Sequence, residues 1–121
     1  MLNSYKELTV WQKSIDLVIE IYKLTEKFPK EELFGLTSQI KRSAVSIPSN
    51  IAEGYSRKHR QEYIQFMRIA FGSGTELETQ LLIAKKLNFG EKGNLQKSEE
   101  LLEEVLKMLN KMISSLTPPK P

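Results

Sequence analysis

Few residues of this chain have the types and spacing that catalysis requires. The sequence holds one histidine, His59, one aspartate, Asp16, and no cysteine. No His-Glu-x-x-His or Glu-x-x-His spacing is present that would bind a metal. Gly72-Ser73-Gly74 lies within a helical pattern and follows no strand, so it does not read as a nucleotide-binding loop. We therefore expect no enzymatic activity, no cofactor, no metal ion and no small-molecule substrate.

The basic residues gather in one window instead. Residues 41–68 contain six Lys or Arg against two Glu and include all four arginines, whereas residues 1–40 and 69–121 are close to neutral. The planar guanidinium group suits phosphates and stacked bases. The competing interpretation of the run from Arg57 to Arg60 is a solvated helix start, which also accounts for His59. The candidate nucleic-acid-binding residues are Arg42, Arg57, Lys58, Arg60 and Arg68, with Arg68 returning toward the level of Arg42 in an antiparallel hairpin.

One side of the expected second helix carries polar residues that follow a helical spacing. Arg42, Ser46, Asn50, Glu53 and Arg57 fall within about 80° of arc, opposite the apolar row. Three interpretations stay open. The first is a solvated face with an ion pair between Glu53 and Arg57. The second is a bridge from Asn50 and Glu53 to a neighbouring helix or subunit, and the third is a stripe that contacts a ligand or RNA.

The composition describes one folded domain over residues 1–121. Hydrophobic residues make up 40% of the 121 positions and charged residues 27%, which are ordinary values for a soluble globular protein. The longest apolar runs, Leu17–Ile19 and Leu81–Ala84, are far shorter than the roughly 20 residues that cross a bilayer. We expect a cytoplasmic protein of a bacterial type with no membrane partner and, without cysteine, no disulfide.

Apolar residues recur at spacings of three and four, which predicts helices and no strand. The first helix is expected to begin at a capping box formed by Thr9 and Gln12. Because the connections are short, successive helices should be antiparallel. The predicted fold is all-α, an antiparallel up-down four-helix bundle. Its expected helices span about 9–28, 37–55, 57–88 and 94–116, with a loose Pro-rich tail over 117–121.

A proline in the second helix and two glycines in the third disturb this helical pattern. Pro48 removes a backbone donor and crowds the carbonyl of Ala44, yet the apolar row continues through it in phase, which predicts a second helix kinked at Pro48. Gly72 and Gly74 fall inside the third helix, where each costs roughly 1 kcal/mol relative to alanine. We expect this helix to be continuous. A close crossing would offset the cost, and the Ser/Ala-rich second helix is the candidate neighbour.

The first helix has more apolar surface than one bundle core requires. Its apolar positions cover an arc of about 220°, against a stripe of about 100° or somewhat more on a surface helix. This excess predicts that the helix is covered on two sides, by its own bundle and by another subunit. The candidate oligomer-interface residues are Trp11, Ile15 and Tyr22.

Several motifs resemble one known family. One is Arg42-Ser-Ala-Val-Ser-Ile-Pro-Ser-Asn50-Ile-Ala-Glu-Gly54, of which Ser-Ile-Pro-Ser-Asn-Ile-Ala-Glu-Gly is the most specific part. The others are Tyr5-Lys-Glu-Leu-Thr-Val-Trp11-Gln12-Lys13, Phe28-Pro29 before Glu31-Glu32, Gly72-Ser73 before Glu76 and Glu78, and Thr79-Gln80-Leu81-Leu82-Ile83-Ala84. Over about residues 4–115 the chain resembles the 23S rRNA-intervening-sequence family of four-helix bundle proteins.

The resemblance implies properties that the residue pattern alone does not. Proteins of this kind are similar in forming ring-like homopentamers with a central channel, and no enzymatic activity comes with the family. Their genes occur in intervening sequences of large-subunit ribosomal RNA genes. A related branch, the accessory proteins of diversity-generating retroelements, binds nucleic acid and a reverse transcriptase through a basic surface. This chain departs from that branch in being only mildly basic, with a net charge of +3.

Two main functions are compatible with the sequence. The first is a homo-oligomeric helical module, a pentamer by resemblance, that binds structured RNA or a ribonucleoprotein partner through its arginine-bearing surface. The alternative is an oligomeric protein-interaction scaffold with no nucleic-acid role, which the near-neutral charge outside one window favours. A helix-turn-helix over Thr37–Ala44 and Pro48–Tyr55 would require a break at Val45–Ile47, and its reading helix would lack Arg or Lys before Arg57.

Overall fold

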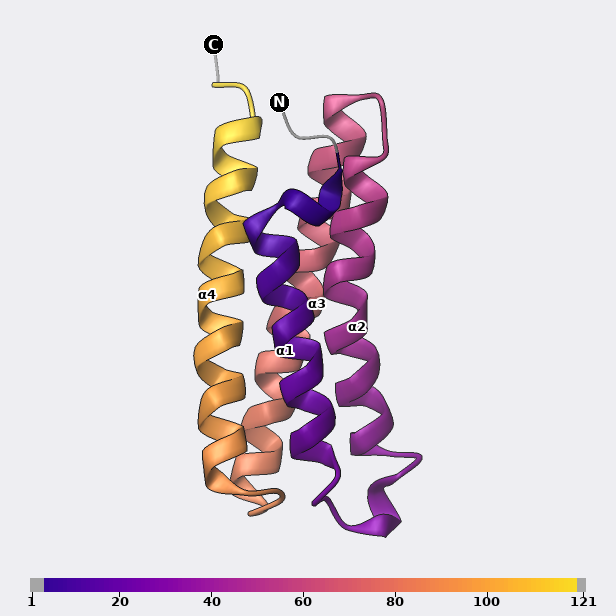
Figure 1. Cartoon of the computed structure of the whole chain (residues 1–121), viewed down its shortest axis with the longest axis vertical. Helices are drawn as coiled ribbons and strands as arrows, with labels where there is room; N and C mark the ends of the chain where they lie inside the picture. The colour runs from indigo at the N-terminus through magenta and orange to yellow at the C-terminus, as the bar shows by residue number, and fades with distance from the viewer. Residues whose placement is uncertain (1–3, 120–121) are drawn as a thin grey trace.

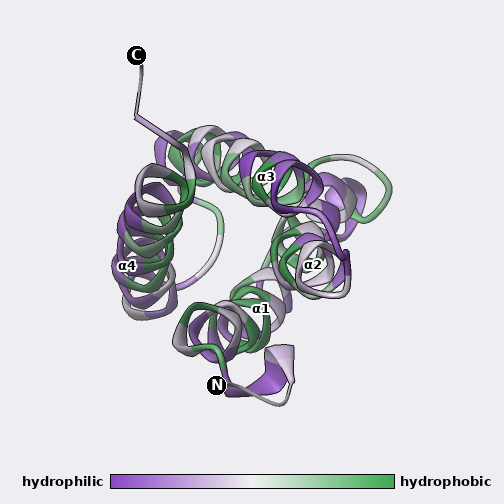
Figure 2. Ribbon diagram, turned by 90° about the horizontal axis from the view of Figure 1, so that it is seen from above, coloured by the Kyte–Doolittle hydropathy of each residue, from purple (hydrophilic) through white to green (hydrophobic). Residues whose placement is uncertain are grey.

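Four α-helices run side by side along one axis in the computed structural model, which describes residues 4–119 (Figure 1). The α2–α3 turn lies at the end where α1 begins and α4 ends, and the other two connections lie at the opposite end. Seen from that first end, the helices surround a common axis in the order α1, α2, α3, α4 (Figure 2). The elements are η1 (Tyr5–Glu7), α1 (Thr9–Thr25), η2 (Lys30–Glu32), α2 (Leu36–Tyr55), α3 (Arg60–Lys86) and α4 (Lys92–Leu116). The predicted all-α antiparallel four-helix bundle is confirmed.

The helix ends differ from the prediction by up to three residues. The first helix ends at Thr25 rather than at Phe28, and the chain then turns through Pro29 into the short helix η2. The third helix begins at Arg60 rather than at residue 57, because His59 has an extended backbone with φ −107° and ψ 133°. Residues 117–119 of the predicted tail are not helical, and residues 120–121 lie outside the described residues.

The start of α1 is not the predicted capping box. Thr9 is already helical, and the N-cap residue is Leu8, whose side chain has no oxygen to accept a hydrogen bond. The Gln12 side chain instead donates from Nε2 to the Lys6 carbonyl at 2.9 Å. This bond holds η1 against the first turn of α1, where the rings of Tyr5 and Trp11 meet edge to face at 5.3 Å.

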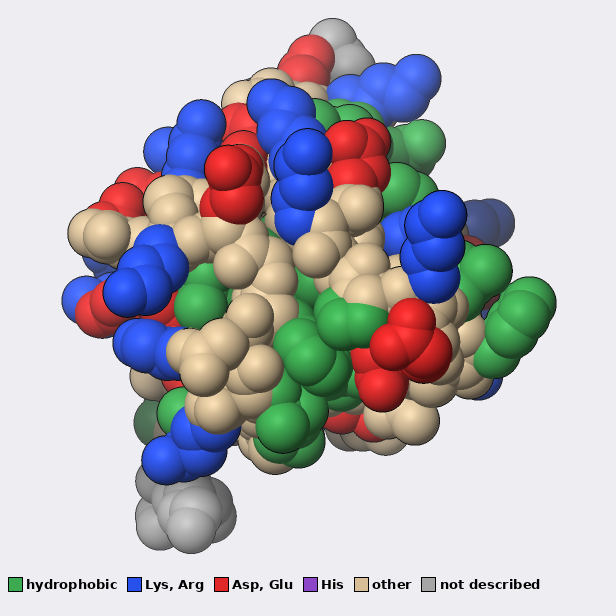
Figure 3. Space-filling view, turned by 90° about the horizontal axis from the view of Figure 1, so that it is seen from below, with side chains coloured by type: hydrophobic (Ala, Val, Ile, Leu, Met, Phe, Trp, Pro, Cys, Tyr) green, Lys and Arg blue, Asp and Glu red, His purple; other side chains and the backbone are tan. Residues whose placement is uncertain are grey.

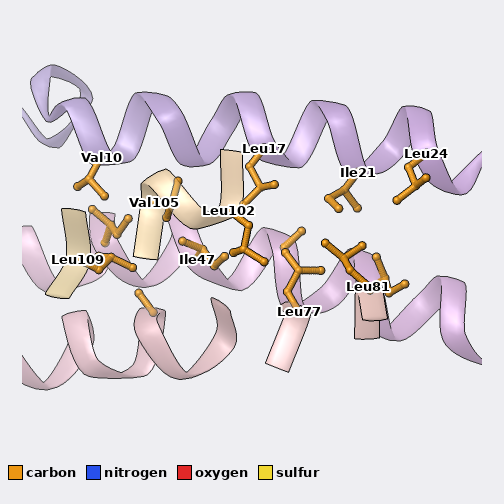
Figure 4. Close-up of a cluster of buried hydrophobic side chains, with 14 of the residues drawn as sticks. Val10, Leu17, Ile21, Leu24, Ile47, Leu77, Leu81, Leu102, Val105 and Leu109 are labelled. Carbon is orange, nitrogen blue, oxygen red and sulfur yellow. The ribbon is translucent and has the colours of Figure 1, made fainter. Parts of the chain in front are cut away.

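The core consists of apolar side chains that all four helices direct inward. One row of α1 points across the bundle at the heptad seam of α4 and at residues of α2 and α3 (Figure 4). The labelled side chains are each at most 3% exposed, so burial of apolar surface supplies the main driving force for folding. They are Val10, Leu17, Ile21, Leu24, Ile47, Leu77, Leu81, Leu102, Val105 and Leu109.

Helix α2 passes Pro48 without a break. Ile47, Pro48 and Ile51 are all buried, so the core face continues on both sides of the proline as the apolar row predicts. A helix-turn-helix needs two helices separated at Val45–Ile47, and that alternative is therefore wrong. The kink at Pro48 stays a prediction.

Helix α3 is continuous through Gly72 and Gly74, as predicted. The predicted neighbour was wrong, however. A Cβ on Gly74 would lie 2.5 Å from Cδ2 of Leu106, so the close crossing is with α4 and not with α2. The close approach of α2 to α3 occurs instead at Gly54, where a Cβ would lie 2.7 Å from Cβ of Phe66. The spacing of apolar residues could not show whether α2 or α4 is the neighbour, because Gly74 faces the bundle interior, which both helices border.

Candidate nucleic-acid interface

The basic residues that follow α2 lie in an open turn at one end of the bundle. Helix α2 ends at Tyr55 and α3 begins at Arg60, and every residue between them is exposed. Lys58 and Arg60 form no hydrogen bond or ion pair with any of the described residues. No side chain caps α3 at His59, so the first amides of that helix keep their partial positive charge. The turn therefore presents cationic side chains beside an open helix N-terminus.

Arg57 is held more tightly than its neighbours. Its Nη2 lies 3.0 Å from Oε1 of Glu53, one turn back on α2. Its guanidinium carbon also lies 5.0 Å from the centre of the Phe66 ring on α3, a distance at which a cation and an aromatic face attract. The side chains of Arg57 and Glu53 are 41% and 52% exposed. Arg57 thus joins the basic turn with its charge already partly matched.

Hydrogen bonds between small polar residues fix the register of α2 against α3. The hydroxyl oxygens of Ser46 and Ser73 lie 2.8 Å apart and share a hydrogen bond. Three residues earlier on α2, Ser43 donates from Oγ to Oε1 of Glu76 at 3.1 Å, three residues later on α3. The two helices therefore run antiparallel, and each residue further along α3 lies level with one residue earlier on α2.

This register separates Arg42 from Arg68. Arg42 lies level with Leu77, and Arg68 lies level with Ile51. The two exposed arginines are therefore nine residues apart along the hairpin, roughly 13 Å at 1.5 Å per residue. The five candidate cations do not form one continuous stripe. Three of them meet at the turn, and Arg42 and Arg68 are each separate.

The polar side of α2 is largely used inside the α2–α3 hairpin. Asn50 donates from Nδ2 to the Ser46 carbonyl at 2.7 Å and to the Ser46 hydroxyl at 2.9 Å, and Ser46 in turn bonds to Ser73. Glu53 pairs within its own helix with Arg57. The solvated ion pair is thus present at Glu53. The predicted bridge from Asn50 and Glu53 to a neighbouring helix is not formed: Ser46 makes the bond to α3, and Asn50 bonds to Ser46 within α2.

The three candidate interface residues of α1 are not equivalent. Trp11 is half-buried and packs against the core, so it belongs to the bundle as much as to its surface. Ile15 is half-buried, and Tyr22 is 43% exposed with Nζ of Lys41 4.7 Å from its ring centre. Exposed apolar side chains that the prediction missed lie beside them, at Ile19 on α1 and Val45 on α2. The sequence could have indicated Ile19, because it lies between Ile15 and Tyr22 on the same face of the helix.

The phenol of Tyr63 is the one titratable group, among those described, whose pKa clearly departs from its ordinary value. Burial first, and then the nearby Tyr55 phenol, raises the pKa of Tyr63 above 10.0. The two rings meet edge to face at 6.0 Å, beside the Gly54 contact. This cluster packs the α2–α3 hairpin just below the basic turn.

The described residues also bear on metal and membrane binding. Within residues 4–119, no group of three or more His, Asp or Glu side chains is placed to hold a metal ion. None of the helices in this part of the chain combines the length and the apolar character that a membrane span needs. His59 lies exposed in the basic turn.

The fold and surface together define an up-and-down four-helix bundle with a cationic turn at one end. The chain belongs to the 23S rRNA-intervening sequence protein family, which matches residues 6–111. The resemblance seen in the motifs is thereby confirmed.

A solved structure supports the same fold. The chain is similar to the crystal structure of a protein of unknown function from the S23 ribosomal protein family of Bacteroides thetaiotaomicron VPI-5482. The TM-score is 0.77 at 25% sequence identity, and the similarity covers 87% of this chain and 98% of that chain. A comparison with curated proteins gives no match.

Proposed function

We propose that this chain is a self-associating, non-enzymatic four-helix module that binds structured RNA, or a ribonucleoprotein partner, through the basic α2–α3 turn. The observation that carries the proposal is the exposure of Lys58 and Arg60 beside Arg57, with no acidic partner for the first two among the described residues. Phosphate oxygens are the natural ligands of such a group, because Lys and Arg neutralise them and release counterions.

The shape of the turn supports phosphate binding rather than base reading. The cations lie at the end of the bundle, next to the open N-terminus of α3, where helix amides favour an anion. Among the described residues, the rings of Tyr55 and Tyr63 pack against each other, and the Phe66 ring faces the guanidinium group of Arg57. Contacts from such cations to phosphates position a nucleic acid without reading its sequence, so binding should be weak, salt-sensitive and tolerant of sequence.

A charge-matched comparison tests the proposal. Wild-type protein and an Arg57/Lys58/Arg60→Ala variant are titrated with a structured ribosomal RNA fragment at about 50 and 200 mM salt. A Lys27/Lys30/Lys92→Ala variant is the control, because it removes three exposed cations from the opposite end of the bundle. Loss of affinity in the first variant and not in the control supports the proposal. If the affinities are equal, or if the wild type does not bind at the lower salt, RNA binding is excluded and the alternative function as a protein-interaction scaffold is favoured.

Self-association is the second part of the proposal. Its support is the apolar surface along α1 and α2, where Ile19, Tyr22 and Val45 are 53%, 43% and 40% exposed. Contiguous apolar patches on a protein surface mark interaction sites. A ring of identical subunits would repeat the basic turn, and repeated weak contacts to one RNA would gain by avidity. The pentamer is the assembly that the family resemblance implies.

A specific observation also favours the alternative scaffold. Phe34, in the α1–α2 connection, is 92% exposed, and its neighbour Leu33 is 52% exposed. Figure 3 shows the end of the bundle at which this connection lies, with hydrophobic side chains between charged ones. A photo-crosslinking residue in place of Phe34 tests this function: a crosslink to a different protein in cells, together with no RNA affinity, would support the scaffold.

A further inference from the structure

The outer face of α2 forms the floor of an open hollow just below the basic turn. The rings of Tyr5, from η1, and Phe66, from α3, border this hollow, and both are half-buried. Its volume is about 540 Å³, within the range of sites that hold small ligands. The residues of α2 that line it are all small or polar: Ser49, Asn50, Ala52, Glu53 and Ser56.

The most specific motif of the sequence runs along this hollow, and packing accounts for only part of it. Ile47, Pro48 and Ile51 of the motif are buried in the bundle. Ser49 is exposed in the interior of the helix, and no other described residue bonds to its hydroxyl. Serine and asparagine form helices less readily than alanine or the long charged residues do. The outward residues of the motif therefore weaken the helix slightly, and their small size keeps the hollow open.

The hollow offers aromatic surface and an open hydrogen-bond acceptor. Both Nδ2 protons of Asn50 are donated to Ser46, so the side-chain oxygen of Asn50 stays open as an acceptor. The guanidinium carbon of Arg57 lies 5.0 Å from the centre of the Phe66 ring. Unpaired RNA bases stack on aromatic rings and on guanidinium planes, and the ribose 2′-hydroxyl donates to acceptors of this kind.

We propose that this hollow holds one unpaired nucleotide of the RNA whose phosphates bind the basic turn. The proposal rests on the RNA binding proposed above and adds a second contact to it. Arg57 connects the two, because it belongs to the basic turn and also lies against the Phe66 ring at the border of the hollow.

A nucleotide in this hollow would give a preference for RNA structure and not for RNA sequence. A base within a duplex is stacked between its neighbours, whereas a bulged or looped base is free to enter a protein site. Stacking on aromatic side chains accepts every base, since each has a π-face. The hollow should therefore favour RNA with an unpaired nucleotide, whichever base that nucleotide carries.

Two RNA hairpins that differ in a single base test the proposal. One has a bulged adenosine in its stem, and the other has an abasic residue at the same place, so both carry the same number of phosphates. At about 50 mM salt, wild-type protein should bind the first hairpin at least about fivefold more tightly, as expected for the stacking of one base.

Two variants and a control locate the base in the hollow. Phe66→Leu removes a ring from the border but keeps the Cβ that packs against Gly54. Ser49→Gln places a longer side chain on the floor, at an exposed position. Each variant should bring the ratio of the two affinities to about one. Phe71→Leu removes a half-buried ring of α3 outside the hollow and should keep the wild-type ratio.

The outcomes separate this site from the proposed RNA binding. If wild-type protein binds neither hairpin, the RNA binding and the nucleotide site are both overturned. If it binds both hairpins equally, the nucleotide site alone is overturned and phosphate binding at the turn stands. The site is also overturned if either hollow variant keeps the wild-type ratio, with helical circular dichroism showing that the variant is folded.

Discussion

The Cβ of Phe66 on α3 lies against the backbone of Gly54 on α2, and a Cβ on Gly54 would be only 2.7 Å from it. The ring of Tyr63 closes the same site at 3.3 Å. Since a Cβ is fixed to the backbone, neither helix can yield by rotating a side chain. Gly54 therefore sets how closely the two helices of the hairpin approach below the basic turn.

The first prediction is that Gly54→Ala destabilises the fold. Overpacking a tight contact costs about 1–3 kcal/mol, and the better helix propensity of alanine returns about 1 kcal/mol. Because the clash is with a Cβ that cannot rotate away, the overpacking cost should lie at the upper end of its range. The net loss in the free energy of unfolding should then be about 2 kcal/mol, measured by urea denaturation at a fixed protein concentration. Gly93→Ala, at an exposed glycine with open space, should cause no loss. A Gly54→Ala variant as stable as wild type would show that the hairpin can widen freely.

The second prediction concerns the crossing of α3 with α4. A side chain at Gly74 would meet Leu106 and Leu102, so Gly74→Leu should lower the free energy of unfolding by about 1–3 kcal/mol. The contact is with the end of a leucine side chain, which suggests a rescue. Adding Leu106→Ala should recover part of the loss, because it vacates the occupied volume. If Gly74→Leu alone melts at or above the wild-type temperature, the close-approach explanation is wrong.

The sequence predicts the bundle well because apolar spacing reports burial directly. The apolar rows continue in phase through Pro48 and through Gly72–Gly74, and both helices are unbroken. The buried side chains of such a row together stabilise the helix by more than one missing backbone hydrogen bond or two glycines destabilise it. Helix ends depend on single hydrogen bonds. Residue types alone could not show that Gln12 bonds to the Lys6 carbonyl and does not form a capping box with Thr9.

The candidate site was less predictable, because it depends on which side chains meet across helices. Spacing places Arg42 and Arg57 on one side of α2, and it also indicates the ion pair of Arg57 with Glu53. It does not give the register of α2 on α3, which the Ser46–Ser73 contact fixes. That register is what separates Arg42 from Arg68. The interface residues show the same limit, since an apolar arc does not tell that Trp11 packs inward while Tyr22 faces out.

The third prediction uses that difference between Trp11 and Tyr22. Trp11 packs against the core and against Tyr5, so Trp11→Glu should lower the free energy of unfolding by about 3 kcal/mol or more. Tyr22→Glu should leave the fold intact and lower the mass seen by light scattering at low micromolar concentration. A wild-type mass near 14.0 kDa, the mass of one chain, would contradict self-association.

The fourth prediction follows from the buried phenol of Tyr63. Burial raises its pKa above 10.0, so the folded chain holds the proton more tightly than the unfolded chain does. The resulting stability is fully present below about pH 10 and is lost as the pH rises through the higher folded-state pKa. The free energy of unfolding should therefore fall more steeply above about pH 10 in wild type than in Tyr63→Phe.

The last prediction is that Glu53→Gln strengthens RNA binding. Oε1 of Glu53 lies 3.0 Å from Arg57 and competes with phosphate for that guanidinium. Exposed ion pairs contribute only about 0–1 kcal/mol to stability, so the fold should hardly change. One more free cation should steepen the dependence of log affinity on log salt by about 0.7–0.9.

Glu103→Gln provides the matched control for this change. Glu103 pairs with Lys107 at 3.1 Å, also one helical turn apart, but on α4 and away from the basic turn. Both variants raise the net charge by one, so a purely global charge effect would strengthen binding equally in both. A gain confined to Glu53→Gln, measured as RNA affinity across a salt series, would place Arg57 in the interface. Equal gains would assign the effect to net charge, and no gain in either variant would exclude Arg57 from RNA contact.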